Sequence, residues 1–312
     1  MTVMTHSERK RRILNNALPI ICVLLTTLML LFGEDMKAGF IGGARLALLK
    51  ILPTLFPFFI LADLWSTVFE PSSSSKELHF FEKPFGVSNG ALSAFIIGMV
   101  CGFPLGVRSA VKQYEYEGIG QKELEWLCPL VNNPSAAFVI SGIGAGLYGS
   151  ISVGVYLYLS VIFSAVLIGI FSRPSLKISE KTHVITRQSF NLTSSIRSAG
   201  MSSLAILSYI VFFSALIGLL RSFIKNELLL TVISCFLEIS SACSMTAFQF
   251  GGTEPLSLAV CAFALGFSGF SVHLQAFSFM PSSLSKKRYL FTKLLIGILS
   301  TLIAFSFSFI VI

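Results

Sequence analysis

Hydrophobic residues dominate this chain in long stretches that short polar segments separate. Uninterrupted apolar stretches run over 13–32, 51–69, 151–171, 204–220 and 289–311. A helix needs roughly 20 apolar residues to cross the hydrocarbon core of a bilayer, and each stretch is close to that length. The pattern therefore predicts five plain membrane-spanning helices, of which the first is an N-terminal anchor.

Four further apolar stretches are interrupted by glycine, proline or polar residues. They run over 91–110 (interrupted at 102–106), 124–148 (at 132–135), 226–250 (at 238–241) and 255–280 (at 266–271). Lipid cannot satisfy the backbone N–H and C=O groups that such breaks expose, so they survive only inside protein or beside a wet cavity. We expect all four breaks to face the protein interior.

The order of these stretches predicts two related halves. The expected domains are an anchor helix (1–33), a first repeat (34–173), a cytoplasmic linker (174–190) and a second repeat (191–312). Each half has an amphipathic lead-in (36–50 or 191–200), a plain span, two broken stretches and a final plain span. If each first broken stretch is a re-entrant hairpin, the chain crosses the membrane seven times and the repeats are inverted. This geometry is typical of secondary transporters.

Composition and charge support a membrane location. Hydrophobic residues make up 54% of the chain and charged residues only 12%, which a water-soluble domain does not tolerate. In the inverted topology, most of the 23 lysines and arginines, including Lys293, fall on the cytoplasmic side. The exceptions are Lys37, Arg45, Lys50, Arg221 and Lys225. This bias places the N-terminus in the cytoplasm of a bacterial cell. It also explains the net charge of +8 without nucleic-acid binding.

The broken segments supply the candidate binding site. Half-helix ends at mid-membrane present unpaired donors and acceptors that together suit one small polar solute. The candidate residues are Gly102, Pro104, Gly106, Arg108, Asn132, Asn133, Ser135, Glu238, Ser240, Ser241, Ser268, Ser271, His273 and Gln275. The alternatives are that the first break is a proline-kinked helix packed through its glycines, and that the asparagines and Ser135 only cap opened helices.

Three ionisable residues are candidates for coupling solute movement to an ion. Glu238 lies in an apolar segment where a charged side chain costs roughly 2.5–3.5 kcal/mol, so it should face the protein interior or be protonated. Its alternative role is a helix-end carboxylate that accepts backbone N–H groups. His273 either titrates or hydrogen-bonds the opened backbone. Asp63 suits an interfacial carboxylate, and Arg108 suits a side chain that reaches the interface.

The sequence gives no pattern for catalysis, metal or cofactor binding. Its six cysteines lie in or beside apolar segments without CxxC spacing, and no P-loop is present. Gly266-Phe267-Ser268-Gly269 has the GxSG form of intramembrane serine proteases. However, His273 is five residues from Ser268 across broken backbone, so a productive base–nucleophile pair is not expected. We expect no enzymatic activity.

Several motifs carry a family resemblance over most of the chain. They are LFPFFILADL, GFPLGVRSA, LVNNPSAAFVISGIGAGLYGS, LEISSA and GFSGFSVHLQAFSF, in this order. With them the sequence resembles the bacterial sporulation integral membrane protein (YlbJ) family. The resemblance implies the nucleoside-recognition or Gate domain group, whose hairpins and broken helices look like those of concentrative nucleoside transporters and the ferrous iron transporter core. Here Gly106-Val107-Arg108 replaces the usual Gly-Ala-Lys, and Asn132-Asn133-Pro134-Ser135 replaces Asn-Asn-Ala-Ser-Pro.

Two functions follow as expectations. The first is a transporter for a small polar solute, such as a nucleoside or related anion, in the cytoplasmic membrane of a spore-forming bacterium. The alternative is a non-transporting membrane component that supports spore envelope assembly through the loops 71–89 and 174–189. Membrane lipid and the solute are the expected partners, and a homo-oligomer is compatible with both functions.

Overall fold

The computed structural model describes residues 19–20, 22–69, 87–115, 119–174, 191–250 and 254–311. Within these residues the chain is helical and contains no β-strand. The predicted anchor lies partly outside this range, and its described part forms a short apolar helix over Cys22–Leu31. Almost all of the loop 71–89 and of the linker 174–190 lies outside the described residues.

Four helices of the described chain are long and apolar enough to cross a membrane, or up to five if one bent pair counts as a single span. They are Ile151–Phe171 (α8), Leu192–Phe223 (α9), Pro255–Phe279 (α12 with α13) and Lys286–Ser306 (within α14), and the bent pair joins Gly33–Ile51 to Leu55–Leu61. The protein is therefore an all-α, multi-span membrane protein.

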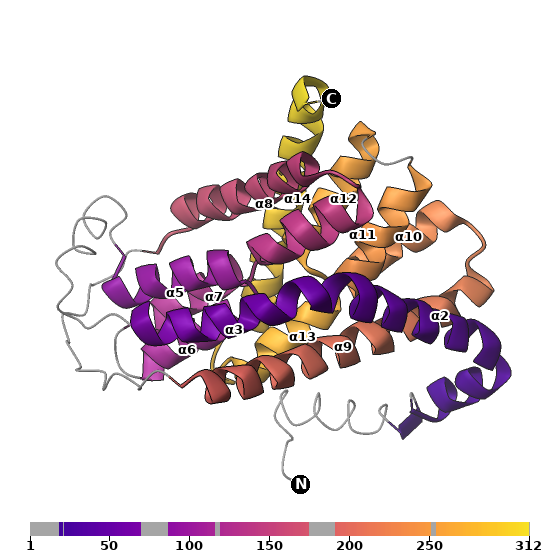
Figure 1. The fold of residues 1–312 in the computed structure, drawn as a ribbon, viewed down its shortest axis with the longest axis horizontal. Helices are drawn as coiled ribbons and strands as arrows, with labels where there is room; N and C mark the ends of the chain where they lie inside the picture. The colour runs from indigo at the N-terminus through magenta and orange to yellow at the C-terminus, as the bar shows by residue number, and fades with distance from the viewer. Residues whose placement is uncertain are drawn as a thin grey trace, which may run out of the picture.

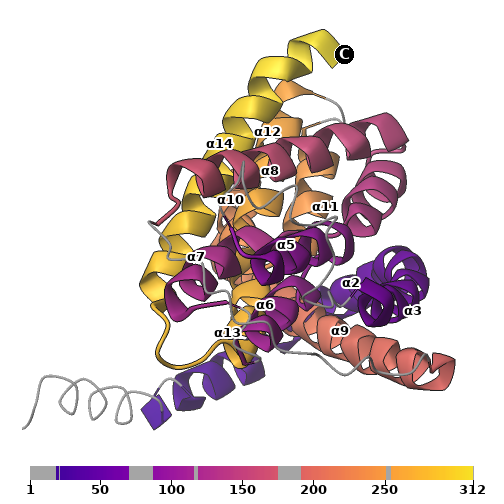
Figure 2. The same ribbon diagram turned by 90° about the vertical axis from the view of Figure 1, so that its left-hand side faces the viewer.

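The long helices form two groups with the short helices between them (Figures 1 and 2). On one side, α2 (Gly33–Leu46) and α3 (Leu52–Phe69) pack along α9. On the other side, α8, α12 and α14 (Lys286–Val311) pack together. Paired glycines allow some of these close approaches, since a Cβ at Gly39 would lie 2.9 Å from the Cα of Gly218. Small residues at helix contacts are the usual means of packing in membranes.

All four predicted interruptions are confirmed as breaks between consecutive helices. The broken pairs are α5 (Asn89–Cys101) with α6 (Leu105–Glu115), α7 (Gln121–Val131) with the π-helical segment η2 (Ala137–Ala145), α10 (Glu227–Leu237) with α11 (Ile239–Gln249), and α12 (Pro255–Phe267) with α13 (Gly269–Phe279). The interruptions themselves are 102–104, 132–135, 238 and 268. Proline, glycine and polar residues at these points fail to continue the helical hydrogen bonding.

The lead-ins differ between the two halves. In the first half, the helix that ends in η1 (Ala47–Ile51) is bent by 53° from the helix that follows. In the second half, the predicted lead-in and span form one helix of 32 residues, α9. The reason is local: the bend lies between Ile51 and Leu55, where Pro53 stands, and Pro57 follows within α3. No proline occurs within α9, so its hydrogen bonding runs on without interruption.

Candidate functional site

The first two breaks close on each other. The backbone N–H of Phe103 donates to the carbonyl oxygen of Asn133 at 2.9 Å. Gly102 has a φ of +70°, and a Cβ there would lie 2.3 Å from the backbone nitrogen of Ser135. A Cβ at Gly106 would lie 2.2 Å from the carbonyl oxygen of Val131. Only glycine at positions 102 and 106 permits these close approaches of backbone to backbone. The α5–α6 and α7–η2 breaks therefore form one unit, which we call the first break pair.

The other two breaks form a second break pair. At Gly269, which has a φ of +67°, a Cβ would lie 3.2 Å from the backbone nitrogen of Glu238. Ser268 also has a positive φ, of 77°, and its hydroxyl donates to the carbonyl of Leu265 at 3.1 Å. The α12–α13 break therefore packs directly against the α10–α11 break.

A small central cavity lies where the two break pairs meet. Residues from each broken segment contribute to its wall: Phe103, Phe138, Glu238, Ile239, Ser240, Ser271, Val272 and Gln275. Its volume is about 10 Å³, which is at the lower limit for a single water molecule. The structure thus gathers Glu238, Ser240, Ser271 and Gln275, as the sequence predicted, but in a closed arrangement.

Glu238 sits at the break between α10 and α11 with 1% of its surface exposed. Its carboxylate accepts hydrogen bonds from the backbone N–H groups of Ser240 at 2.9 Å and Ser241 at 2.6 Å. This is the helix-end role that the sequence left open as an alternative. The same side chain lines the central cavity, so the two roles are compatible. The hydroxyl of Ser240 has no hydrogen-bond partner among the described residues.

His273 is fully buried but does not line the central cavity. Its ring contacts Phe267 edge-on at a centroid distance of 4.7 Å and Tyr289 at 5.5 Å. Neither ring nitrogen has a hydrogen-bond partner among the described residues, so the predicted bond to the opened backbone is not made. His273 and Ser268 likewise form no hydrogen bond with each other, because the Ser268 hydroxyl donates to Leu265.

The polar residues of the α7–η2 break, in the first break pair, bind the opened helix ends and α14. The amide nitrogen of Asn133 donates to the carbonyl of Leu130 at 2.6 Å, and the hydroxyl of Ser135 accepts from the N–H of Phe138 at 3.2 Å. The Asn132 amide donates to the hydroxyl of Tyr289 in α14. The first two bonds match the capping alternative, whereas the bond of Asn132 joins the break to α14. None of the three residues lines the central cavity.

A larger space, which we call the vestibule, adjoins the central cavity. It has a volume of about 430 Å³, and its wall includes Pro104, Arg108, Ser198, Ser202, Tyr209, Gln275 and Ser278. Tyr209 and Gln275 line both spaces and therefore stand between them. Arg108 is exposed and forms part of the vestibule wall. Asp63 accepts a hydrogen bond from Ser198 at 3.3 Å, which places it behind this wall.

Lys293 is a site residue that the sequence did not reveal. The charge pattern assigned it to the cytoplasmic side, but the structure buries it completely within α14. Its ammonium donates to the carbonyl of Asn132 at 2.9 Å and to the side-chain oxygen of Asn133 at 3.2 Å. The sequence did contain a signal for this position, because four residues of the apolar stretch 289–311 separate Lys293 from the basic run 286–288. Its closeness to that run nevertheless led to its assignment to the cytoplasmic side.

No group of three or more His, Cys, Asp or Glu side chains that could hold a metal ion occurs in the part of the chain that the structure describes. The cysteines are free: Cys22 is exposed and the other five are buried. The expectations of no metal, no cofactor and no catalysis stay predictions.

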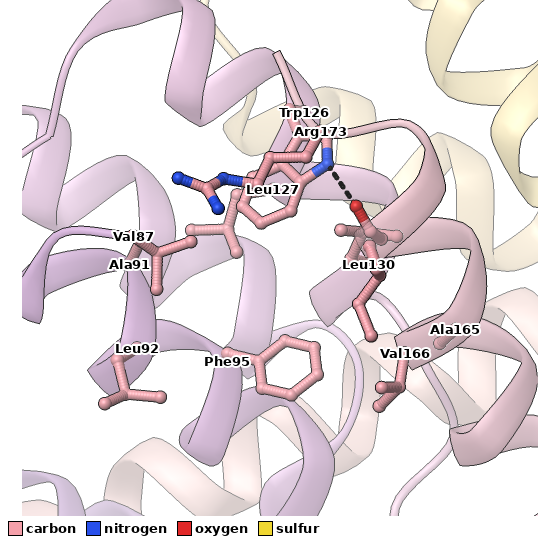
Figure 3. Close-up of a pocket in the computed structure, with 12 residues that line it drawn as sticks. Val87, Ala91, Leu92, Phe95, Trp126, Leu127, Leu130, Ala165, Val166 and Arg173 are labelled. Atoms are coloured by element: carbon pink, nitrogen blue, oxygen red, sulfur yellow. Dashed lines mark hydrogen bonds between the residues drawn. The ribbon is translucent and has the colours of Figure 1, made fainter. Parts of the chain in front are cut away.

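A separate apolar pocket lies between α5, α7 and α8 (Figure 3). Its volume is about 110 Å³, and its lining is almost entirely hydrocarbon. The indole N–H of Trp126 donates to the carbonyl of Gly169 at 3.1 Å, and Arg173 lies beside Trp126 at one end of the pocket (Figure 3). No sequence-predicted site residue lines it, and an apolar group fits it better than a polar solute.

No family model matches this chain, and no curated protein or solved structure is significantly similar to it. Its function must therefore be argued from the geometry of the break pairs, the central cavity and the vestibule.

Proposed function

We propose that this protein is a gradient-driven transporter or permease for a small polar solute. The observation that carries the proposal is the meeting of four broken helices around a cavity with a buried carboxylate. In secondary transporters, discontinuous helices place their ends at the substrate site in this way. The vestibule adds a path to the cavity that is blocked by two side chains, Tyr209 and Gln275.

The polar groups at the cavity suggest how a solute is held. The Glu238 carboxylate can accept hydrogen bonds, the Ser240 hydroxyl can donate or accept, and the side-chain oxygen of Gln275 has no partner among the described residues. Arg108 gives the vestibule a positive charge that attracts anionic or strongly polar solutes. This set suits a solute with several hydroxyl, amide or phosphate groups. A nucleoside or a related anion meets that description.

The central cavity is too small to hold such a solute, so transport requires rearrangement. Movement of Tyr209 and Gln275 would join the vestibule to the cavity, and separation of the break pairs would enlarge it. The inverted arrangement of the halves proposed from the sequence would then allow access from the opposite side. The proposed setting is the cytoplasmic membrane during sporulation, with the N-terminus in the cytoplasm. This setting rests on the family resemblance and the distribution of basic residues.

The test is solute accumulation in proteoliposomes that contain the purified full-length protein. Radiolabelled uridine is the first probe, followed by a panel of nucleosides, nucleotides and small organic anions. We expect uptake above that of protein-free liposomes, and loss of this uptake in Glu238→Gln. His273→Ala should also impair uptake, through repacking of the aromatic cluster around the α12–α13 break.

Two results would contradict the proposal. One is uptake equal to that of empty liposomes for the whole panel. The other is full function of Glu238→Gln and His273→Ala in sporulating cells at normal expression. The envelope-assembly alternative would be favoured if deletion of 71–89 or 174–189 abolished sporulation while cells with Glu238→Gln sporulated normally.

A further inference from the structure

The whole side chain of Lys293 is buried, and the helix that carries it is long and apolar enough to cross a membrane. It is the eighth residue of α14, which places it about 10 Å along the helix axis from the first residue. Removing an ammonium ion from water costs several kcal/mol unless nearby groups compensate for the lost hydration. The contacts of its Nζ atom should therefore show what compensates this charge.

Both hydrogen-bond acceptors of Lys293 lie immediately after the last turn of α7. They are the carbonyl oxygen of Asn132, which is the C-terminal cap of α7, and the side-chain oxygen of Asn133. The carboxyl end of a helix carries partial negative charge from its aligned peptide groups. No ion pair joins Lys293 to a carboxylate within the described residues. Helix-end oxygens thus take the place of a counter-ion.

The same break is attached to α14 at a second point. Tyr289 lies four residues before Lys293 on α14, and its hydroxyl accepts a hydrogen bond from the Asn132 amide. Two side chains of α14, one turn apart, thus bind the two residues that open the α7–η2 break. This arrangement fixes the position of the ammonium relative to the exposed backbone.

Exposed carbonyl oxygens at the carboxyl end of a broken helix are the groups that bind sodium or protons in transporters of this general architecture. We propose that Lys293 is a tethered cation, whose ammonium occupies an oxygen-lined cation site at the end of α7 in place of a free metal ion. The α7–η2 break is thereby tied to α14 without sodium or potassium. The role of this break in solute movement rests on the proposed function, but the occupancy of the cation site does not.

The proposal predicts that a small cation can replace the missing ammonium in the variant Lys293→Ala. The substitution removes Cγ, Cδ, Cε and Nζ, which together match one n-propylammonium ion. It leaves the oxygens of Asn132 and Asn133 facing the vacated space. An added small cation should therefore rebind there, whereas Lys293→Met fills the space with a neutral chain and leaves no room for one.

The experiment is thermal unfolding of the purified full-length protein in detergent, followed by the reaction of a thiol-sensitive dye with the buried cysteines. We expect the wild-type Tm to be the same in sodium, potassium and choline chloride. Lys293→Ala should lower the Tm by roughly 5–10 °C. n-Propylammonium chloride should restore at least half of this loss, while n-propanol should not. Lys287→Ala, which removes an exposed lysine six residues before Lys293 on the same helix, is the control and should leave the Tm unchanged.

Three results would overturn the proposal. They are stabilisation of the wild-type protein by sodium over choline, a Tm of Lys293→Met equal to or above that of the wild type, and equal rescue of Lys293→Ala by propanol and propylammonium. If Lys293→Ala does not fold, the wild-type salt series and Lys293→Met still decide. Because no solute enters this experiment, its outcome is independent of whether uptake is found in proteoliposomes.

Discussion

The two break pairs bury opposite charges at opposite kinds of helix end. In the first pair, the Lys293 ammonium binds oxygens at the carboxyl end of α7. In the second pair, the Glu238 carboxylate accepts the N–H groups at the amino end of α11. Each arrangement has the sign that the helix dipole favours. The comparison teaches that a membrane interior can neutralise a charge with opened backbone instead of with an opposite charge.

The two pairs also differ in what they face. The second pair contributes the Glu238 carboxylate to the central cavity, whereas the first pair contributes only Phe103 and Phe138 and its bound Lys293 does not reach the cavity. The second pair therefore supplies the polar groups that can contact a solute, and the first pair holds two segments of backbone together. If this division is correct, substitutions in the first pair should affect stability most, and substitutions around the second pair should affect both stability and uptake.

The largest effect is expected from Gly102→Ala, which forces the first break pair apart. The new Cβ would lie 2.3 Å from the backbone nitrogen of Ser135, at a φ of +70°. Backbone cannot yield as a flexible side chain can, so we expect a loss of about 3 kcal/mol or more in the free energy of unfolding. Folded yield and Tm measure it. Gly200→Ala is the matched control, since a Cβ there meets nothing within 4 Å. Equal behaviour of the two variants would refute the tight backbone contact.

The next effect is expected at Glu238, in the second break pair. Glu238→Ala leaves the N–H groups of Ser240 and Ser241 without acceptors, and each buried unsatisfied donor costs about 1–3 kcal/mol. Glu238→Gln keeps one acceptor oxygen and should lose about half as much. Chemical denaturation in detergent would compare them. A wild-type stability for Glu238→Ala would show that the cap contributes nothing.

A double-mutant cycle sharpens the comparison of the two charges. Combining Lys293→Met with Asn133→Ala should reveal a coupling of about 0.5–3 kcal/mol, because the two residues share a hydrogen bond. Combining Lys293→Met with Glu238→Gln should be additive within about 0.5 kcal/mol. Strong coupling between Lys293 and Glu238 would mean that the charges stabilise each other, contrary to our interpretation.

Gln275→Leu should separate function from stability. Gln275 lines both the cavity and the vestibule. Its side-chain oxygen has no hydrogen-bond partner among the described residues, so the substitution leaves no donor to that oxygen unsatisfied. We expect an unchanged Tm and a fall in solute uptake of about tenfold, equivalent to one lost interaction of roughly 1.4 kcal/mol. Ser278→Ala, on the vestibule wall alone, serves as the comparison and should retain uptake. The proposed path would be wrong if Gln275→Leu transported normally.

The smallest effect is expected from Ser268→Gly. Glycine relieves the positive φ of 77° at this break, while the hydrogen bond from the hydroxyl to Leu265 is lost. The two contributions, each about 1 kcal/mol, oppose one another, so stability should change by less than about 1 kcal/mol. Uptake should persist. Loss of a proteolytic activity in Ser268→Ala would instead revive the GxSG interpretation.

Local features made much of this architecture predictable. The breaks at 102–104, 132–135, 238 and 268 were predictable because glycine, proline and polar residues interrupt apolar stretches, and lipid tolerates such interruptions only inside protein. The capping role of Glu238 was predicted as an alternative because Ser240 and Ser241 lie close behind it, where an opened helix exposes backbone N–H groups. The continuity of α9 was not foreseen, because amphipathic and apolar segments can share one helix when nothing interrupts its backbone.

The sequence by itself determined the membrane location, the helical class and the positions of the four breaks, because each depends on hydropathy and backbone chemistry over a few neighbouring residues. Only the tertiary structure decided which breaks meet, that Glu238 faces a cavity whereas His273 packs against aromatic rings, and that Lys293 is buried against Asn132 and Asn133. Those facts depend on contacts between residues as far as 161 positions apart, and no local pattern encodes such contacts.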